Sequence, residues 1–262
     1  MARLESIYRY PVKGLSSEKL DRATLTAGAY FPGDRLFAIE NGPSGFDPSA
    51  PVHQPKTKYL MLMRDERLAT LRTRYEDATG TLSIQQDGRE AVRADLATGE
   101  GRLAVEAFFR RFMPHDLRGP PKVLTAPSSY RFTDSRSGFV SIINLASVAQ
   151  LETLIGRPVH PLRFRANFYV EDWTAWSEFD LVDCEFAIGA VRLKGIKRIV
   201  RCAATNVDPD TGIRDLEIPN TLMRNFDHMD CGIYAQVIAP GEIAPGADLL
   251  VLDKREASLG IR

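Results

Sequence analysis

The chain has 262 residues, 44% of them hydrophobic, which is enough to bury one large core or two smaller ones. Lys and Arg together number 34, as do Asp and Glu, so the net charge is zero. This balance argues against a general nucleic-acid or membrane-surface partner, because such proteins normally carry a basic excess. The three cysteines are too few for a disulfide framework, and an odd number leaves a free thiol.

The N-terminus has no apolar signal core, and the sequence has no apolar run of roughly 18 residues. We therefore expect a cytoplasmic protein with no membrane span.

The first half of the chain predicts short strands and one helix. Apolar and polar side chains alternate over 3–10, as in a half-buried strand, and Pro11 ends that run. Leu103, Val105 and three phenylalanines cover one face of a helix predicted over 101–112. Other short apolar stretches, separated by Gly- and Pro-containing turns, lie at 35–39, 59–63, 68–72, 81–85 and 122–125.

The second half predicts two helices among further strands. Apolar residues at helical spacing indicate a helix over 145–155 with Asn144 as its N-cap, and a weaker helix is predicted at 217–226. Strands are predicted at 164–170, 184–200, 231–238 and 249–251.

These elements together predict a mixed, β-rich (α+β) fold made of two barrel-like β units with a few helices. The segment 114–138 contains four prolines and little apolar periodicity, which favours a boundary or crossover there. We therefore predict an N-terminal unit over 1–115 and a second unit over 116–262.

Cys202 is the most informative candidate for chemistry. It follows an apolar strand and precedes a turn of sequence Asp208-Pro209-Asp210-Thr211-Gly212. Lys197, Arg198 and Arg201 lie close in sequence, and nearby cations stabilise a thiolate, which is a soft metal ligand and a nucleophile. A free cysteine is nevertheless more often a small buried hydrophobic residue.

Other sites built on these residues have weaker support. His228 and Cys231 could join Cys202 as zinc ligands, but structural zinc usually needs four ligands in paired spacing. A Cys–His protease is possible in principle, although no nucleophile signature surrounds Cys202. The turn at 208–212 lacks the remaining acidic positions of a calcium loop.

Several separated basic and polar residues could form an anion pocket. Lys13 lies in a turn that contains Gly14, and Arg35 follows a second turn. Arg165 and Asn167 alternate, so that a strand would place both on the same face. For each of them alone, a solvated charge or a surface ion pair is the more ordinary interpretation.

Six segments in order resemble the MOSC-domain proteins that carry an N-terminal MOSC β-barrel domain, the group of the mitochondrial amidoxime-reducing component and its bacterial relatives. The resemblance covers nearly the whole chain, and the order and spacing of the segments are more specific than any one of them. The segments are 7–14, 33–39, 164–168, 200–202, 207–212 and 232–235.

The resemblance implies that Cys202 ligates molybdenum of a molybdenum-molybdopterin cofactor. Lys13 and Arg35 would contact the phosphate and polar edge of the pterin, and Arg165, Asn167 and Arg201 would line the pocket. Bidentate arginine suits such an anion. Asp208 and Thr205 are candidates for proton delivery or support near Cys202, and Asn144 stands where the relatives carry Ser.

This sequence also departs from the family pattern. Gly14 replaces a Ser that commonly follows the Lys, and the run 53–56 replaces an Arg-Gln-Glu-Pro-Arg segment, which puts substrate or partner contacts there in doubt. The chain has no Cys-rich iron–sulfur signature after its last predicted strand, so electrons would come from a separate protein or small reductant. Pyridoxal phosphate binding is a further term attached to the family.

Three functions follow as hypotheses. The first is a molybdenum-dependent oxidoreductase that reduces N-hydroxylated or N-oxide compounds. The second is a sulfur carrier or transferase with a persulfide on Cys202. The third is a non-catalytic carrier of the molybdenum cofactor.

Overall fold

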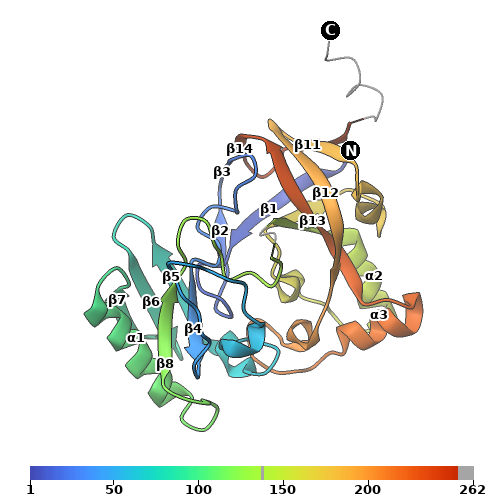
Figure 1. The fold of residues 1–262 in the computed structure, drawn as a ribbon. Coiled ribbons are helices and arrows are strands. Elements are labelled where there is room, and N and C mark those ends of the chain that lie inside the picture. The colour runs from blue at the N-terminus through green and yellow to red at the C-terminus, as the bar shows by residue number, and fades with distance from the viewer. Residues whose placement is uncertain (137–138, 253–262) are drawn as a thin grey trace.

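The computed structural model describes residues 1–136 and 139–252, and its larger part is one mixed eight-stranded sheet (Figure 1). The strands are β1 (Arg3–Arg9), β2 (Glu18–Leu20), β9 (Val140–Asn144), β10 (Phe168–Glu171), β11 (Glu185–Ile188), β12 (Val191–Val200), β13 (Asp230–Ala239) and β15 (Leu249–Val251). Their spatial order is β15-β11-β12-β13-β9-β10-β1-β2. β9 and β10 pair in parallel, whereas the other neighbours pair antiparallel.

The sheet curls until β1 meets the segment that leads into β15. Leu4 N donates to Ala247 O at 2.8 Å, and Gly246 N donates to Leu4 O at 2.7 Å. Within the described residues the strand order stays open between β15 and β2, so the ladder does not form a closed barrel. The predicted mixed, strand-rich α+β fold is confirmed, with a curled sheet in place of a closed ladder.

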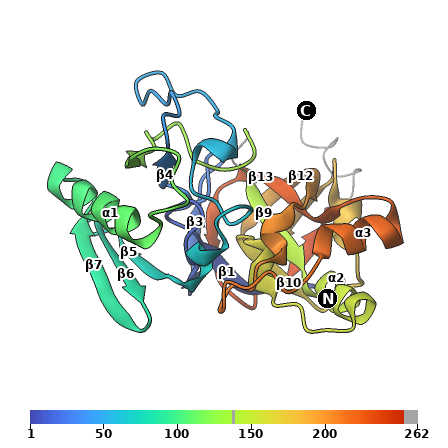
Figure 2. The same ribbon diagram turned by 90° about the horizontal axis from the view of Figure 1, so that it is seen from below.

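A smaller unit lies at the opposite end of the molecule from α2 (Leu145–Ile155) and α3 (Ile218–Phe226) (Figures 1 and 2). It contains the pair β4 (Phe37–Asn41) and β8 (Pro121–Thr125) and the meander β5 (Arg72–Glu76), β6 (Thr81–Gln86) and β7 (Arg89–Asp95). Helix α1 (Gly99–Phe112) buries Val105 and its three phenylalanines in this core, as the pattern over 101–112 predicts, but Leu103 of that pattern is exposed.

The two halves of the sequence exchange strands between these units. β1 and β2 come from the N-terminal half but pair within the large sheet. β3 (Ala23–Leu25) pairs with β14 (Gly241–Ile243), and β8 returns to pair with β4. Because strands cross in both directions, the boundary near residue 115 stays a prediction.

The structure corrects four predicted strands. The run 68–72 falls mostly in the 3₁₀ helix Glu66–Thr70, and β5 begins only at Arg72. The run 59–63 is not a strand but a buried loop after the 3₁₀ turn Lys56–Lys58, joined to β4 by one bridge and the bond from Leu60 N to Ile39 O. The segment 184–200 is a hairpin, because a turn at Gly189 separates β11 from β12.

The segment 164–170 is also shorter as a strand than predicted. Phe164 ends the 3₁₀ turn Pro161–Phe164, and Arg165 has a left-handed φ of 52°, so β10 starts only at Phe168.

None of the helices in the described ranges is both long and apolar enough to cross a membrane.

Candidate functional site

A cavity of about 370 Å³ lies where residues from both halves of the sequence meet. Eight Lys and Arg side chains but only two Asp side chains line it, although the chain as a whole is neutral. The cavity is therefore a local basic site suited to an anionic ligand. Seven predicted site residues line it: Lys13, Arg35, Arg165, Asn167, Arg201, Cys202 and Thr205.

Cys202 lies just beyond the end of β12, as the sequence predicts, and the local backbone fixes its position. Arg201 N donates to Met229 O at 2.8 Å, which extends the pairing with β13 by one bond. The 3₁₀ turn Ala203–Asn206 then begins, with the N–H and hydroxyl of Thr205 donating to Cys202 O at 3.0 and 2.9 Å. Cys202 is partly exposed and lines the cavity, so its sulfur is open to a ligand.

Two lysines and one aspartate connect the N-terminal half to this sulfur. Lys56 Nζ donates to Cys202 Sγ at 3.3 Å and lies 3.7 Å from Asp134. Lys13 Nζ donates to Asp134 at 2.5 Å and to Phe132 O at 2.9 Å. Asp134 thus holds both ammonium groups on the wall of the cavity that Cys202 shares.

The charges of this cluster are set mainly by their neighbours. Burial lowers the pKa of Lys13, and Asp134 offsets this only in part. Burial also lowers the pKa of Lys56, but Asp134 and Cys202 act against it and leave that pKa raised. Burial opposes the ionisation of Asp134, yet Lys13 and Lys56 bring its pKa well below the usual range. Since the Asp134 side chain is 49% exposed, we assign its shift to the two ammonium groups.

Arg35 and Arg165 bring two positive charges to another wall of the cavity. Each guanidinium carbon lies 4.4 Å from the centre of the Tyr10 ring. Arg35 forms an ion pair with Asp34 at 2.5 Å, and its other end donates to Arg165 O at 3.0 Å. Arg165 Nη1 donates to Leu15 O at 2.7 Å.

In the described part of the chain Arg165 forms no ion pair with a carboxylate that would balance its charge. Burial, and next the charge of Arg35, lower the pKa of Arg165 to about 10. An anion bound in the cavity would relieve this repulsion.

Arg201 lines the cavity, and its guanidinium packs closely against Gly232. Its Nε donates to Cys231 O at 2.7 Å and its Nη1 to Phe164 O at 3.0 Å. Gly232 has a φ of 76°, and a Cβ there would lie 2.3 Å from Ile142 O and 3.2 Å from Arg201 Nη2. Only glycine fits this approach without strain.

Nη2 of Arg201 and Nη2 of Arg165 are buried nitrogens without a hydrogen-bond partner in the described part of the chain. Buried N–H groups are rarely left unpaired, so an acceptor supplied by a ligand is expected here. Both side chains line the cavity, and the pair fits an anionic group such as a phosphate.

Asn167 lines the cavity, but its side-chain amide is hydrogen-bonded to neighbouring strands. Its Oδ1 accepts from the N–H and hydroxyl of Ser141 at 3.1 and 2.9 Å, and its Nδ2 donates to Tyr8 O at 3.2 Å. These bonds join β1 to β9 beneath the cavity. Asn167 therefore fixes the wall on which Arg165 stands.

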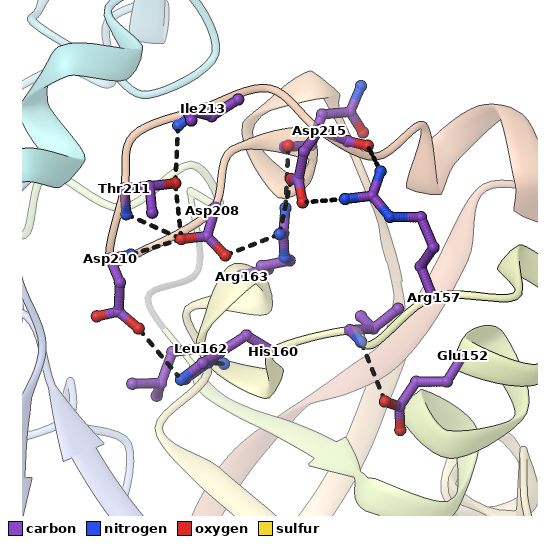
Figure 3. Close-up of polar contacts among 12 residues, drawn as sticks. Glu152, Arg157, His160, Leu162, Arg163, Asp208, Asp210, Thr211, Ile213 and Asp215 are labelled. Carbon is purple, nitrogen blue, oxygen red and sulfur yellow. Dashed lines mark hydrogen bonds and ion pairs between the residues drawn. The ribbon is translucent and has the colours of Figure 1, made fainter.

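Asp208 lies outside the cavity lining, next to Arg163 (Figure 3). Its Oδ1 accepts from the N–H groups of Asp210 and Thr211, and its Oδ2 pairs with Arg163 at 3.0 Å. Burial opposes its ionisation, but these hydrogen bonds leave its pKa lowered. These contacts give Asp208 a role in holding the turn, and its part in proton delivery stays a prediction.

Asn144 also lies apart from the cavity lining, and it caps α2 as predicted. Its Oδ1 accepts from Ala146 N at 3.0 Å. Its Nδ2 donates to Thr174 O at 2.7 Å and to the buried Glu178 at 3.0 Å. The structure gives Asn144 a role in folding and no contact with the basic wall.

An Asn144→Ala variant should therefore lose stability and keep its ligand affinity. Loss of the cap and of bonds to buried partners is expected to lower the free energy of unfolding by about 2–4 kcal/mol. Urea unfolding measures the loss, and calorimetric titration with inorganic pyrophosphate below the transition measures the affinity. A several-fold fall in pyrophosphate affinity in the folded variant would mean that Asn144 contributes to the ligand site.

The other sites considered for the cysteines find no support in the geometry. Cys231 is buried, which raises the pKa of its thiol to about 12, so it is a poor zinc ligand. Across 1–136 and 139–252, no group of three or more His, Cys, Asp or Glu residues is placed to hold a metal ion. No histidine is found among the described residues that line the cavity beside Cys202, as a Cys–His protease would need.

The cavity lining also includes residues without a role in the sequence prediction, among them Lys56, Asp134, Arg163 and Tyr234. Lys56 stands in the run that departs from the family pattern, which was its one signal. Arg163 precedes Arg165 by two residues, so the same alternation that singled out Arg165 and Asn167 includes it. Asp134 and Tyr234 had no local signal.

This fold and site define a protein with a basic cavity beside one partly exposed thiol. The MOSC domain model matches residues 129–249, and the MOSC N-terminal beta barrel domain model matches residues 1–112. The chain belongs to the MOSC-domain proteins with that N-terminal domain.

Curated relatives include two amidoxime-reducing components. Human mitochondrial amidoxime-reducing component 1 is 26% identical over an alignment of 247 positions, and the match covers 86% of this chain and 72% of that protein. Bovine mitochondrial amidoxime reducing component 2 is 38% identical over 87 residues, 33% of this chain, and this match spans 25% of the bovine protein. Among solved structures, YuaD from Bacillus subtilis is 11% identical and covers 95% of this chain and 94% of its own, with a TM-score of 0.44.

Proposed function

We propose that the protein binds a molybdenum-pterin cofactor in this cavity and reduces N-hydroxylated or N-oxide compounds with electrons from a separate donor. The observation that carries the proposal is the single thiol of Cys202 beside two buried, unpartnered arginine N–H groups. The similarity to proteins named amidoxime-reducing components supports the reaction class.

The donor set fits a metal that arrives with ligands of its own. One thiol is too little to hold a metal ion alone, whereas a pterin dithiolene supplies two further sulfurs, and thiolates are soft ligands. Nη2 of Arg165 and Nη2 of Arg201 would donate to the phosphate or polar edge of the pterin. Bound in this way, the cofactor supplies two-electron chemistry, and the protein supplies binding and electrostatics.

The residues of this chain have distinct tasks in that reaction. Lys56 Nζ donates to the sulfur of Cys202 at 3.3 Å and holds that side chain against the cavity wall. Asp134 positions Lys56 and Lys13, and Asn167 and Gly232 fix the walls that carry the arginines. Overall, two electrons and two protons cleave the N–O bond and release water, and the electrons come from a protein carrier or a small reductant.

A sulfur carrier with a persulfide on Cys202 is the second candidate, because the partly exposed thiol next to Lys56 would suit it as well. It would leave the buried N–H groups of Arg165 and Arg201 without a purpose. Intact mass distinguishes the two: a persulfide adds one sulfur atom that dithiothreitol removes, and elemental analysis would then find little molybdenum.

The test is a reductase assay on protein loaded with the molybdenum cofactor. With reduced viologen as donor, it should convert benzamidoxime to benzamidine, and cofactor-free protein should not. Activity toward a hydroxylamine and an N-oxide in the same assay defines the substrate class. If loaded protein at full molybdenum occupancy reduces none of the three, the oxidoreductase proposal fails and the cofactor-carrier hypothesis gains.

A further inference from the structure

Arg163 is a buried charge in the cavity lining to which the proposed function gives no task, and it lies between the two segments that build the site. Its side chain is 1% exposed. It belongs to the 3₁₀ turn Pro161–Phe164, directly before Arg165. Its guanidinium reaches across to the loop that follows Cys202 (Figure 3).

Three bonds tie Arg163 to that loop. Nη1 donates to Asn206 O at 3.0 Å, and Asn206 is the last residue of the turn that begins after Cys202. Nη2 donates to Asp208 at 3.0 Å and to Asp215 at 2.7 Å. Asp208 in turn holds the N–H groups of Asp210 and Thr211, so one side chain organises the loop from 206 to 215.

The same loop also docks on the N-terminal half. Arg214 donates to Leu62 O and Met63 O at 2.9 Å each, and these two residues line the cavity. Arg72 donates to Asp210 O at 3.1 Å. Displacement of the loop would therefore disturb both the turn at Cys202 and the opposite wall.

We infer that Arg163 is the positioning residue for Cys202: it fixes the sulfur relative to Arg165 by holding both ends of the loop at 206–215. Arg163 acts through Asn206 and Asp208 and contacts no reacting group. Only its value for metal binding rests on the proposed function, because the position of the thiol is a property of the ligand-free protein.

The test compares Arg163→Met with Arg157→Ala in cofactor-free protein. Arg157 is a matched control, since it also pairs with Asp215, at 3.2 Å, but is 56% exposed and, among the described residues, bonds to neither Asn206 nor Asp208. The readouts are the rate of Cys202 alkylation by iodoacetamide, with the partly exposed Cys184 as internal reference, and amide exchange over 203–213.

We expect Arg163→Met to raise the Cys202 rate relative to Cys184 by about fivefold or more and to speed exchange over 203–213, since the bonds to Asn206 and Asp208 are lost. Arg157→Ala should change neither. Equal behaviour of the two variants overturns the inference.

Should Arg163→Met fail to fold, Asp208→Asn provides the same test with the Arg163–Asp215 pair intact. It should raise the Cys202 rate about two- to threefold while the melting temperature stays near that of the wild type, because one bond of the network weakens. An unchanged Cys202 rate in this variant would also overturn the inference. Neither readout depends on turnover, so a negative reductase assay leaves this test unaffected.

Discussion

A Cys202→Ala variant is expected to lose tightly bound molybdenum, by more than about tenfold relative to wild type, and with it all reductase activity. In the described part of the chain no cluster of His, Cys, Asp or Glu offers a replacement ligand. Changes that merely support a ligand already cost about 10- to 100-fold in metal affinity, so removal of the ligand should cost at least as much.

The pterin should respond differently from the metal. Arg165 and Arg201 remain in Cys202→Ala with their unpartnered N–H groups, so part of the pterin affinity should survive. Elemental analysis and fluorescence of the oxidised pterin then give a raised ratio of pterin to molybdenum. Cys184→Ala is the matched control, because Cys184 is also partly exposed but lies outside the cavity lining. Full molybdenum in Cys202→Ala would exclude thiolate ligation.

Cys202 could be predicted from sequence because its signals are local. An apolar strand, a basic run and a tight turn lie within 16 consecutive residues, 197–212, and the structure keeps that order as β12, the turn Ala203–Asn206 and the loop at Asp208. The helices α1 and α2 could also be predicted, because each has apolar residues at helical spacing. Each also has a side-chain N-cap, Thr98 for α1 and Asn144 for α2.

Some strands carried no periodic signal. All five residues of β9 are buried, because the strand lies between β13 and β10 inside the sheet, and such a strand shows no alternation. β7 has the opposite problem: only Ala94 among its residues is buried. The run 59–63 was wrongly predicted as a strand because its apolar side chains are buried, although they belong to a loop and not to a hydrogen-bonded strand.

The rest of the site depends on contacts that no local pattern encodes. Lys56 and Cys202 are 146 residues apart in sequence, yet 3.3 Å separates Nζ from Sγ. Arg163 finds its partners 43 to 52 residues away, and an arginine is buried only when such partners exist. Local patterns singled out Lys13, Arg35 and Arg201, and the family resemblance gave them one shared ligand, because it uses the order and spacing of segments along the chain. It could not supply Lys56, where this sequence departs from the pattern.

An Arg165→Met variant should lower affinity for the anionic ligand without lowering the stability of the ligand-free protein. Two guanidinium groups, those of Arg35 and Arg165, share the ring of Tyr10, and burial with this repulsion already lowers the pKa of Arg165 to about 10. Methionine removes one charge and keeps most of the packing. The lost bond to Leu15 O works in the other direction, so the melting temperature should stay level or rise.

Binding should change far more than stability, since an ionised donor to an anion contributes about 1.5–3 kcal/mol, or roughly 10- to 100-fold in affinity. Calorimetric titration with inorganic pyrophosphate, and cofactor retention after gel filtration, measure the loss. Arg192→Met is the control, because Arg192 belongs to β12 but is 51% exposed and pairs with Glu185. A variant of Arg165 that melts early and still binds as tightly as wild type would mean that this arginine serves the fold, and that the anion lies elsewhere in the cavity.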